Sequence, residues 1–157
     1  MKFKSFLFGL FAILLLWVLL PLSFAYINTA LNLPQIDFGV LKSLGYVLTV
    51  GGVLLALIAS LTFKLHGRGT PMLTEPPKKL VIKGVYKFTR NPIYVAHALI
   101  YLGLFLSLGH IMLLGLFLIG AVGLHIYLIR VEEPILKARY GEDYVRYTQQ
   151  VSRWFIL

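Results

Sequence analysis

The sequence predicts an all-α integral membrane protein with about four transmembrane helices, the last two of which form a hairpin. Of the 157 residues, 59% are hydrophobic and the mean hydropathy is +0.83, whereas a soluble domain is usually about half apolar. The apolar residues are collected into runs, and a helix needs roughly 20 of them to cross a bilayer. The cations flank these runs, as topology-setting charges do. We therefore expect a single membrane domain over residues 1–157, with two spans in residues 1–63 and the functional region in residues 64–157.

The first two apolar runs cover about residues 6–27 and 40–63. Lys2 and Lys4 precede the first run, which could also be a signal peptide. Its apolar stretch is longer than the 7–15 residues typical of a signal peptide, so we favour an uncleaved span. The second span carries small residues at helical spacings on one side, and these predict a close helix-packing face: Gly45, Gly52, Ala56 and Ser60.

A polar loop and a hairpin follow. Residues 64–90 are rich in Gly and Pro, which excludes a regular helix through the middle of the loop. Residues 93–129 are apolar again, with a break at residues 107–110. This pattern predicts two short helices joined by a tight turn, each near the lower length limit for crossing the membrane.

The C-terminal tail, residues 130–157, is polar and is predicted to be helical. Glu133 and Pro134 suit its first turn, because proline fits the first helical position and an acid faces the positive end of the helix dipole. Several apolar and aromatic residues fall on one stripe of this helix: Tyr140, Tyr144, Tyr147 and Val151. We expect the loop and this helix together to form a ligand pocket.

The distribution of charge predicts the topology. If there are four spans, fourteen of the fifteen Lys and Arg residues lie on one side of the membrane, and only Lys42 lies opposite. The positive-inside rule then places both termini and the loop in the cytoplasm. We expect the membrane to be the inner membrane of a bacterium or archaeon. The net charge of +9 is accounted for by this topology and by anionic lipid headgroups, rather than by nucleic acid.

Two polar segments are expected to meet at the cytoplasmic rim. Arg90, Asn91 and Pro92 form a corner where the chain enters the membrane, with Tyr94 one turn later. If the hairpin turns near Gly109, Tyr94 is level with about Leu124 and His125, and Arg90 with about Leu128. This register brings the corner to the same rim as Glu132 and Glu133. The alternative is that Arg90 marks a charged helix end and the acids cap a helix.

Other chemistry is given little support by the sequence. There is no Cys, so thiol chemistry and disulfides are excluded. His97 and His125 lie within apolar runs, which makes them candidate site residues. No acidic residue is near them in the sequence, so we expect each to hydrogen-bond a neighbouring helix rather than to bind a metal, and we predict no metal site. The glycines match neither a Walker nor a Rossmann phosphate-binding pattern.

Two segments resemble a known family. Residues 84–94, Gly-Val-Tyr-Lys-Phe-Thr-Arg-Asn-Pro-Ile-Tyr, are similar to the Gly-x-Tyr-x-x-x-Arg-His/Asn-Pro-x-Tyr motif of the isoprenylcysteine carboxyl methyltransferase family, which is related to phospholipid N-methyltransferases. Residues 132–153, from Glu-Glu-Pro through Tyr-Gly-x-x-Tyr-x-x-Tyr to Val-x-Arg, resemble its C-terminal signature. Residues 67–71 look like the bacterial branch. The resemblance covers residues 64–157 and makes them a methyltransferase-like region.

The resemblance implies an integral membrane methyltransferase that uses S-adenosylmethionine to methylate a lipid-like or amphipathic acceptor, by carboxyl O-methylation or amine N-methylation, at the cytoplasmic face. By motif match, the cofactor would be lined by Gly84, Tyr86, Asn91, Pro92, Tyr94, Glu132 and Glu133. Arg90 and Glu133 would be the catalytic residues, with Glu133 the candidate base for an amine acceptor. The acceptor would meet Arg90, Tyr144 and Tyr147.

Two other functions stay open at this point. Sterol reductases have a similar C-terminal region and bind NADPH, and a small membrane scaffold could keep this fold without catalysis. The adjacent acids Glu132 and Glu133 fit a sulfonium or ammonium group better than the phosphate of NADPH. The identity of the acceptor, the choice of O-, N- or S-methylation and the oligomeric state are left open.

Overall fold

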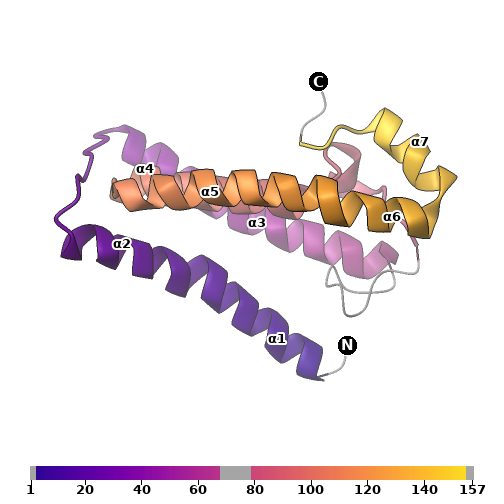
Figure 1. Ribbon diagram of the computed structural model, residues 1–157, viewed down its shortest axis with the longest axis horizontal. Coiled ribbons are helices and arrows are strands. Elements are labelled where there is room, and N and C mark those ends of the chain that lie inside the picture. Colours follow the sequence, from indigo (N-terminus) through magenta and orange to yellow (C-terminus); the bar gives the residue numbers. More distant parts are fainter. Residues whose placement is uncertain (1–2, 68–78, 155–157) are drawn as a thin grey trace. The chain divides into compact units, whose positions relative to one another are not determined.

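The computed structural model describes residues 3–67 and 79–154, and every regular element in these ranges is helical (Figure 1). The helices are α1 (Phe3–Leu14), α2 (Leu20–Ala30), α3 (Leu41–Gly67), α4 (Pro92–Leu108), α5 (Ile111–Tyr127), α6 (Glu133–Tyr140) and α7 (Glu142–Gln150). The predicted all-α class is confirmed. Residues 68–78 of the predicted loop, which include residues 68–71 of the upstream motif, lie outside the described ranges.

Three helical stretches are long and apolar enough to cross a membrane: Leu7–Ala30, Leu41–Gly67 and Ile111–Tyr140. Helix α4 is apolar but shorter. The first stretch joins α1 and α2 through one π-helical turn at Leu15–Leu19. The third joins α5 and α6 through another, at Leu128–Glu132. These stretches make the chain an integral membrane protein.

The chain forms two compact units. Unit 1 consists of Met1–Val50 and Leu99–Gly120, and unit 2 consists of Gly51–Ala98 and Ala121–Leu157.

In unit 1, helices α3 and α4 approach each other backbone to backbone. A Cβ added to Gly45 would lie 2.5 Å from Ser107 Oγ, and one added to Gly103 would lie 2.6 Å from the Gly45 carbonyl oxygen. Neither glycine can therefore be enlarged without moving a helix. Small residues permit this kind of close approach in lipid, and Gly45 serves as predicted.

The rest of the predicted small-residue face is partly right. Gly52 and Ala56 are buried, but Ser60 is exposed and Ala59 is fully buried in its place. The buried positions 52, 56 and 59 advance by four and then three residues, which keeps them on one side of a helix. Ser60 falls one position, about 100°, beyond that line.

The predicted hairpin turn is also in unit 1, at Gly109, whose φ of +73° suits glycine. The polar link after α2 lies against this turn. The Ile36 amide donates to the Gly109 carbonyl at 2.9 Å, and the Gln35 side chain donates to the Leu108 carbonyl at 2.9 Å. The Met112 amide donates to the buried Asn28 side chain at 3.0 Å. The link thus satisfies polar groups that the turn leaves open.

In unit 2, the predicted single C-terminal helix is wrong. The helix before it continues through the π-helical turn into α6, and Gly141 then separates α6 from α7. Gly141 has φ +54° and ψ −130°, a conformation that is costly for any other residue. The predicted apolar stripe is confirmed nevertheless: Tyr144, Tyr147 and Val151 form a buried cluster against which Leu80, Leu136 and Tyr140 pack.

Candidate functional site

The site is built around the corner that leads into α4. A 3₁₀ turn at Gly84–Lys87 precedes it, and α4 begins at Pro92. Proline suits the first helical position and disfavours helix in the residue before it, so Asn91 marks the bend. Gly84 has φ +57°, and a Cβ there would lie 3.1 Å from the Thr62 side chain. The local sequence therefore determines where the chain turns.

The two adjacent acids come from the π-helical turn and the start of α6. Glu132 ends the turn and Glu133 begins α6, so their side chains leave the helix about 100° apart. Glu132 accepts a hydrogen bond from the Tyr94 hydroxyl at 2.5 Å. Glu133 faces Arg90 and Arg153 instead. Single π-helical turns inside longer helices are frequent at functional sites.

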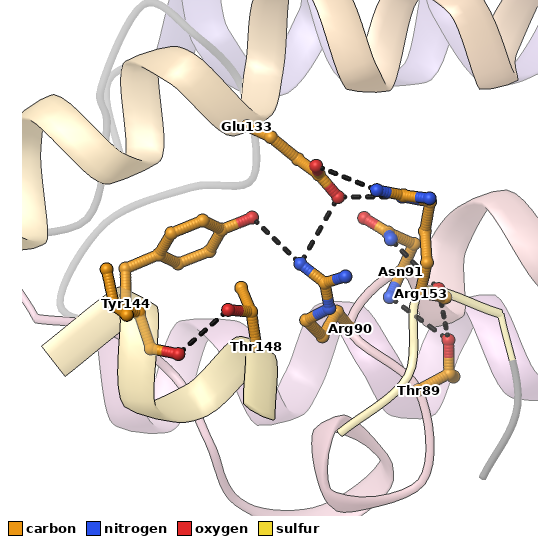
Figure 2. Close-up of polar contacts among 8 residues, drawn as sticks. Thr89, Arg90, Asn91, Glu133, Tyr144, Thr148 and Arg153 are labelled. Carbon is orange, nitrogen blue, oxygen red and sulfur yellow. Dashed lines mark hydrogen bonds and ion pairs between the residues drawn. The ribbon is translucent and has the colours of Figure 1, made fainter. Parts of the chain in front are cut away.

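Three side chains form a charge cluster, which Figure 2 shows: Arg90, Glu133 and Arg153. Arg153 binds Glu133 with two hydrogen bonds, Nε to Oε1 at 2.8 Å and Nη2 to Oε2 at 3.0 Å. Arg90 Nη1 lies 3.2 Å from the same Oε1. The Arg90 and Glu133 side chains are only 10% and 18% exposed. Two cations face one anion here, so the cluster carries a formal charge of +1.

Arg90 also contacts Tyr144. Its Nη1 donates to the Tyr144 hydroxyl at 3.3 Å, while its buried Nε has no hydrogen-bond partner among the described residues. A buried donor without a partner is costly. The guanidinium is therefore held in place by two of its neighbours without all of its donors being used.

The segment after α7 runs along the corner. The Arg90 amide donates to the Ser152 carbonyl at 3.1 Å. The Thr89 hydroxyl and the Asn91 side-chain amide both donate to the Arg153 carbonyl, each at 3.0 Å (Figure 2). Thr89 and Asn91 are buried. Thr89 and Arg153 lie within the two motifs, but the sequence assigned neither of them a role, because these contacts join residues more than sixty positions apart.

Three buried tyrosines lie at the corner: Tyr86, Tyr144 and Tyr147. The Tyr147 hydroxyl donates to the Tyr86 carbonyl at 2.6 Å, and the Tyr86 ring packs with Ala59 and Val81. Burial raises the pKa of Tyr86, Tyr144 and Tyr147. Their hydroxyls therefore stay neutral, and at this site they act as hydrogen-bonding groups rather than as charges.

The predicted convergence of the corner with Glu132 and Glu133 is found, but its register differs. The predicted register put Tyr94 level with Leu124, but Tyr94 contacts Glu132 instead. Leu124 and Glu132 are eight positions apart, about 12 Å along a helix. Helical side chains tilt toward the N-terminus of their own helix. On antiparallel helices Tyr94 and Glu132 therefore lean toward each other, which shortens the distance that their side chains must bridge.

The residues predicted as ligand-binding fall into two groups. In the first group, Pro92 is fully buried, and the side chains of Asn91 and Tyr147 donate hydrogen bonds to backbone carbonyls. These contacts stabilise the protein itself. Arg90, Tyr94, Glu132 and Glu133 bring charged or polar groups together. Direct contact of either group with a ligand stays a prediction.

The two histidines were also candidate site residues, and His125 interacts electrostatically with Glu133. His97 Nδ1 lies 2.6 Å from the Ile93 carbonyl of its own helix. Among the described residues, His125 stacks on Trp154, with ring centroids 5.8 Å apart, rather than making the predicted hydrogen bond to a neighbouring helix. No group of three or more His, Asp or Glu residues in the described ranges could hold a metal ion.

The comparisons with known proteins bear on this geometry. The model of the phospholipid methyltransferase family matches residues 40–143. The chain belongs to the phospholipid methyltransferase family. Searches of curated proteins and of solved structures gave no match. The matched range contains both the corner and the pair of acids, whereas Tyr144, Tyr147 and Arg153 lie beyond its end.

Family membership confirms the resemblance predicted from the two motifs. It makes this chain a membrane methyltransferase of a family whose substrates are of lipid type. Placement in the bacterial branch stays a prediction.

Proposed function

We propose that this membrane methyltransferase takes its methyl group from S-adenosylmethionine and transfers it to a lipid-like or amphipathic acceptor at the cytoplasmic face. The observation that carries the proposal is the arrangement of charge at the corner. Glu132 has a neutral partner, the Tyr94 hydroxyl, and among the described residues no cation lies within ion-pair distance of it. Beside it in the chain, Glu133 belongs to a cluster with a formal charge of +1.

This donor set fits the cofactor. S-adenosylmethionine carries a sulfonium and an ammonium, which suit the uncompensated Glu132, and a carboxylate, which suits the cationic cluster. The residues that would hold it are those of the two motifs: Gly84, Tyr86, Asn91, Pro92, Tyr94, Glu132 and Glu133. When bound, it supplies a methyl group that is electrophilic toward oxygen, nitrogen or sulfur.

The residues of the chain would bind and orient the acceptor. We assign this role to Arg90, with Tyr144 and Tyr147 nearby. Orientation of two reacting groups can supply ~7–11 kcal/mol of a reaction barrier. Methyl transfer from a sulfonium also consumes positive charge, so a site with little water favours it. The largely buried side chains of Arg90 and Glu133 indicate such surroundings.

An amine acceptor must lose a proton, whereas a carboxylate acceptor need not. The sequence predicted Glu133 as the base. In the structure, however, Glu133 receives two hydrogen bonds from Arg153 and forms an ion pair with Arg90, and both contacts favour its charged form. Glu132 has one neutral partner and is therefore better suited to accept a proton. Both N-methylation and carboxyl O-methylation fit the site, with Glu132 acting as base in the first.

The cytoplasmic location rests on the distribution of charge. Fourteen of fifteen Lys and Arg residues lie on one side if α4 crosses the membrane with the three longer stretches. This is the side of both termini and of the corner. The same cations would attract anionic lipid headgroups to the mouth of the site.

The test is calorimetric titration of detergent-purified protein with S-adenosylhomocysteine, with NADPH as the parallel ligand. We expect saturable binding of S-adenosylhomocysteine that is weakened by Glu132→Gln and by Glu133→Gln. Glu142→Gln, at an exposed position on α7, is the matched control and should bind as the unmodified protein does. Binding of NADPH instead would indicate a reductase, and binding of neither ligand by folded protein would refute the proposed function.

A further inference from the structure

We propose that Arg153 is a positioning residue for the reaction, which holds the two halves of the site together and keeps the Arg90 guanidinium available to a ligand. The inference deepens the proposed function and rests on it. It assigns a role to a residue that lies beyond the part of the chain matched by the family model, residues 40–143.

Arg153 forms hydrogen bonds with both halves of the site, the corner before α4 and the pair of acids. Its carbonyl oxygen accepts hydrogen bonds from Thr89 and Asn91, each at 3.0 Å, which ties its backbone to the corner before α4. Its side chain forms the paired hydrogen bonds to Glu133 at the start of α6. Arg153 therefore connects the corner to the pair of acids through a single residue, in addition to the direct contacts of Tyr94 with Glu132 and of Arg90 with Glu133.

The contact with the corner is reinforced by the two residues that precede Arg153. The Ser152 carbonyl accepts from the Arg90 amide at 3.1 Å, and the Val151 side chain is buried with Tyr144 and Tyr147. These contacts fix the backbone on which Arg153 sits. Its side chain is consequently aimed at Glu133 rather than free to sample solvent, although it is 30% exposed.

The geometry of the ion pairs shows what Arg153 does for Arg90. A guanidinium and a carboxylate bind most strongly as a parallel pair of hydrogen bonds. Arg153 takes that arrangement with Glu133, and its hydrogen bond to Glu133 raises the pKa of Arg153. Arg90 makes one longer contact with Glu133, from Nη1 at 3.2 Å, and the same Nη1 also donates to the Tyr144 hydroxyl.

Charge leads to the same conclusion. With Arg153 present, the cluster has two cations for one anion, so a formal charge of +1 is available to an anionic group of the cofactor or acceptor. Without Arg153, Arg90 and Glu133 would neutralise each other, and the carboxylate would be free to take both Arg90 nitrogens. Arg153 thus prevents Glu133 from sequestering Arg90.

The experiment compares Arg153→Gln and Arg153→Lys with the same two changes at Arg146, an exposed arginine on α7. Lysine keeps the charge but cannot reproduce the paired hydrogen bonds. The kcat of methyl transfer is measured per S-adenosylhomocysteine-binding site, with vesicles of phosphatidylethanolamine and with an S-farnesyl cysteine as acceptors. Arginine-selective ¹⁵N labelling reports the Nε–H signal of Arg90, which is one of six arginines and is assigned by its loss in Arg90→Lys.

We expect Arg153→Gln to lower kcat per binding site by about 100-fold, the cost of a displacement of about 1 Å, and to shift the Arg90 signal. Arg153→Lys should recover part of the rate, and the Arg146 variants should change neither measurement. If Arg153 served only stability, kcat per binding site and the Arg90 signal would stay unchanged while the fraction of folded protein fell. That result would overturn the inference.

The two proposals can fail separately. If the unmodified protein binds no S-adenosylhomocysteine, the proposed function is refuted, and the inference falls with it as a statement about the reaction. The Arg90 signal then still decides whether Arg153 holds Arg90. If the unmodified protein binds and turns over but the Arg90 signal ignores Arg153→Gln, the inference alone is refuted.

Discussion

Unit 1 and unit 2 differ in the contacts that stabilise each of them internally. In unit 1, α3 and α4 touch where side chains are missing, at Gly45 and Gly103, and a link of backbone hydrogen bonds covers the hairpin turn at Gly109. In unit 2, charged and aromatic side chains make the contacts, above all at Glu133. The difference teaches that one region is specified by close packing and the other by chemistry, so mutations should separate stability from activity.

The largest expected effect is on the chemistry of unit 2. Arg90→Ala should lower methyl transfer by about 100-fold or more, because the acceptor loses its orienting group. Glu133 keeps its paired hydrogen bonds to Arg153, so the protein should stay folded. The measurement is transfer of radiolabelled methyl groups, with circular dichroism to check the fold. Arg146→Ala is the control, and unchanged transfer in Arg90→Ala would remove Arg90 from the site.

The next effect is on the packing of unit 1. Gly103→Ala places a Cβ against the Gly45 carbonyl and the Thr49 side chain, and overpacking of this kind costs about 1–3 kcal/mol. Gly51→Ala is the matched control, since a Cβ there meets nothing within 4 Å, and alanine favours a helix by about 1 kcal/mol. Unfolding in SDS should show the two variants moving in opposite directions. Equal stability of both would contradict the close contact between α3 and α4.

The smallest effect is expected at an exposed ion pair of unit 1. Asp37 and Lys42 lie 2.8 Å apart, and the hydrogen bond from Lys42 lowers the pKa of Asp37. A lowered pKa in the folded state gives stability that is present above the unfolded pKa, about 3.9, and is lost as the pH falls through the folded value. Because the pair is exposed, Asp37→Asn should leave the melting temperature at neutral pH within experimental error.

Melting temperatures measured across a range of pH, with and without added salt, sharpen the contrast between the two units. Added salt should abolish whatever small pH dependence the Asp37–Lys42 pair contributes, since exposed charges are screened. The partly buried cluster around Glu133 should resist the same salt. A large stabilisation from the exposed pair would mean that its surroundings are less open than the structure shows.

The sequence alone determined the helical class, the hairpin turn at Gly109 and the apolar stripe of Tyr144, Tyr147 and Val151. These features follow from local patterns, namely the length of apolar runs, the positive φ that glycine permits, and helical periodicity. The two motifs could also be recognised in the sequence, and the match of the phospholipid methyltransferase family over residues 40–143 confirms the resemblance.

Only the tertiary structure decided which partner each acid takes. The sequence placed Glu132 and Glu133 near the corner, but the π-helical turn at Leu128–Glu132 and the offset between antiparallel helices direct one to Tyr94 and the other to two arginines. The role of Arg153 could not be predicted because its contacts span twenty to sixty-four residues. Local periodicity carries no information about such pairs; they depend on how the elements pack and on which groups need a partner once water is excluded.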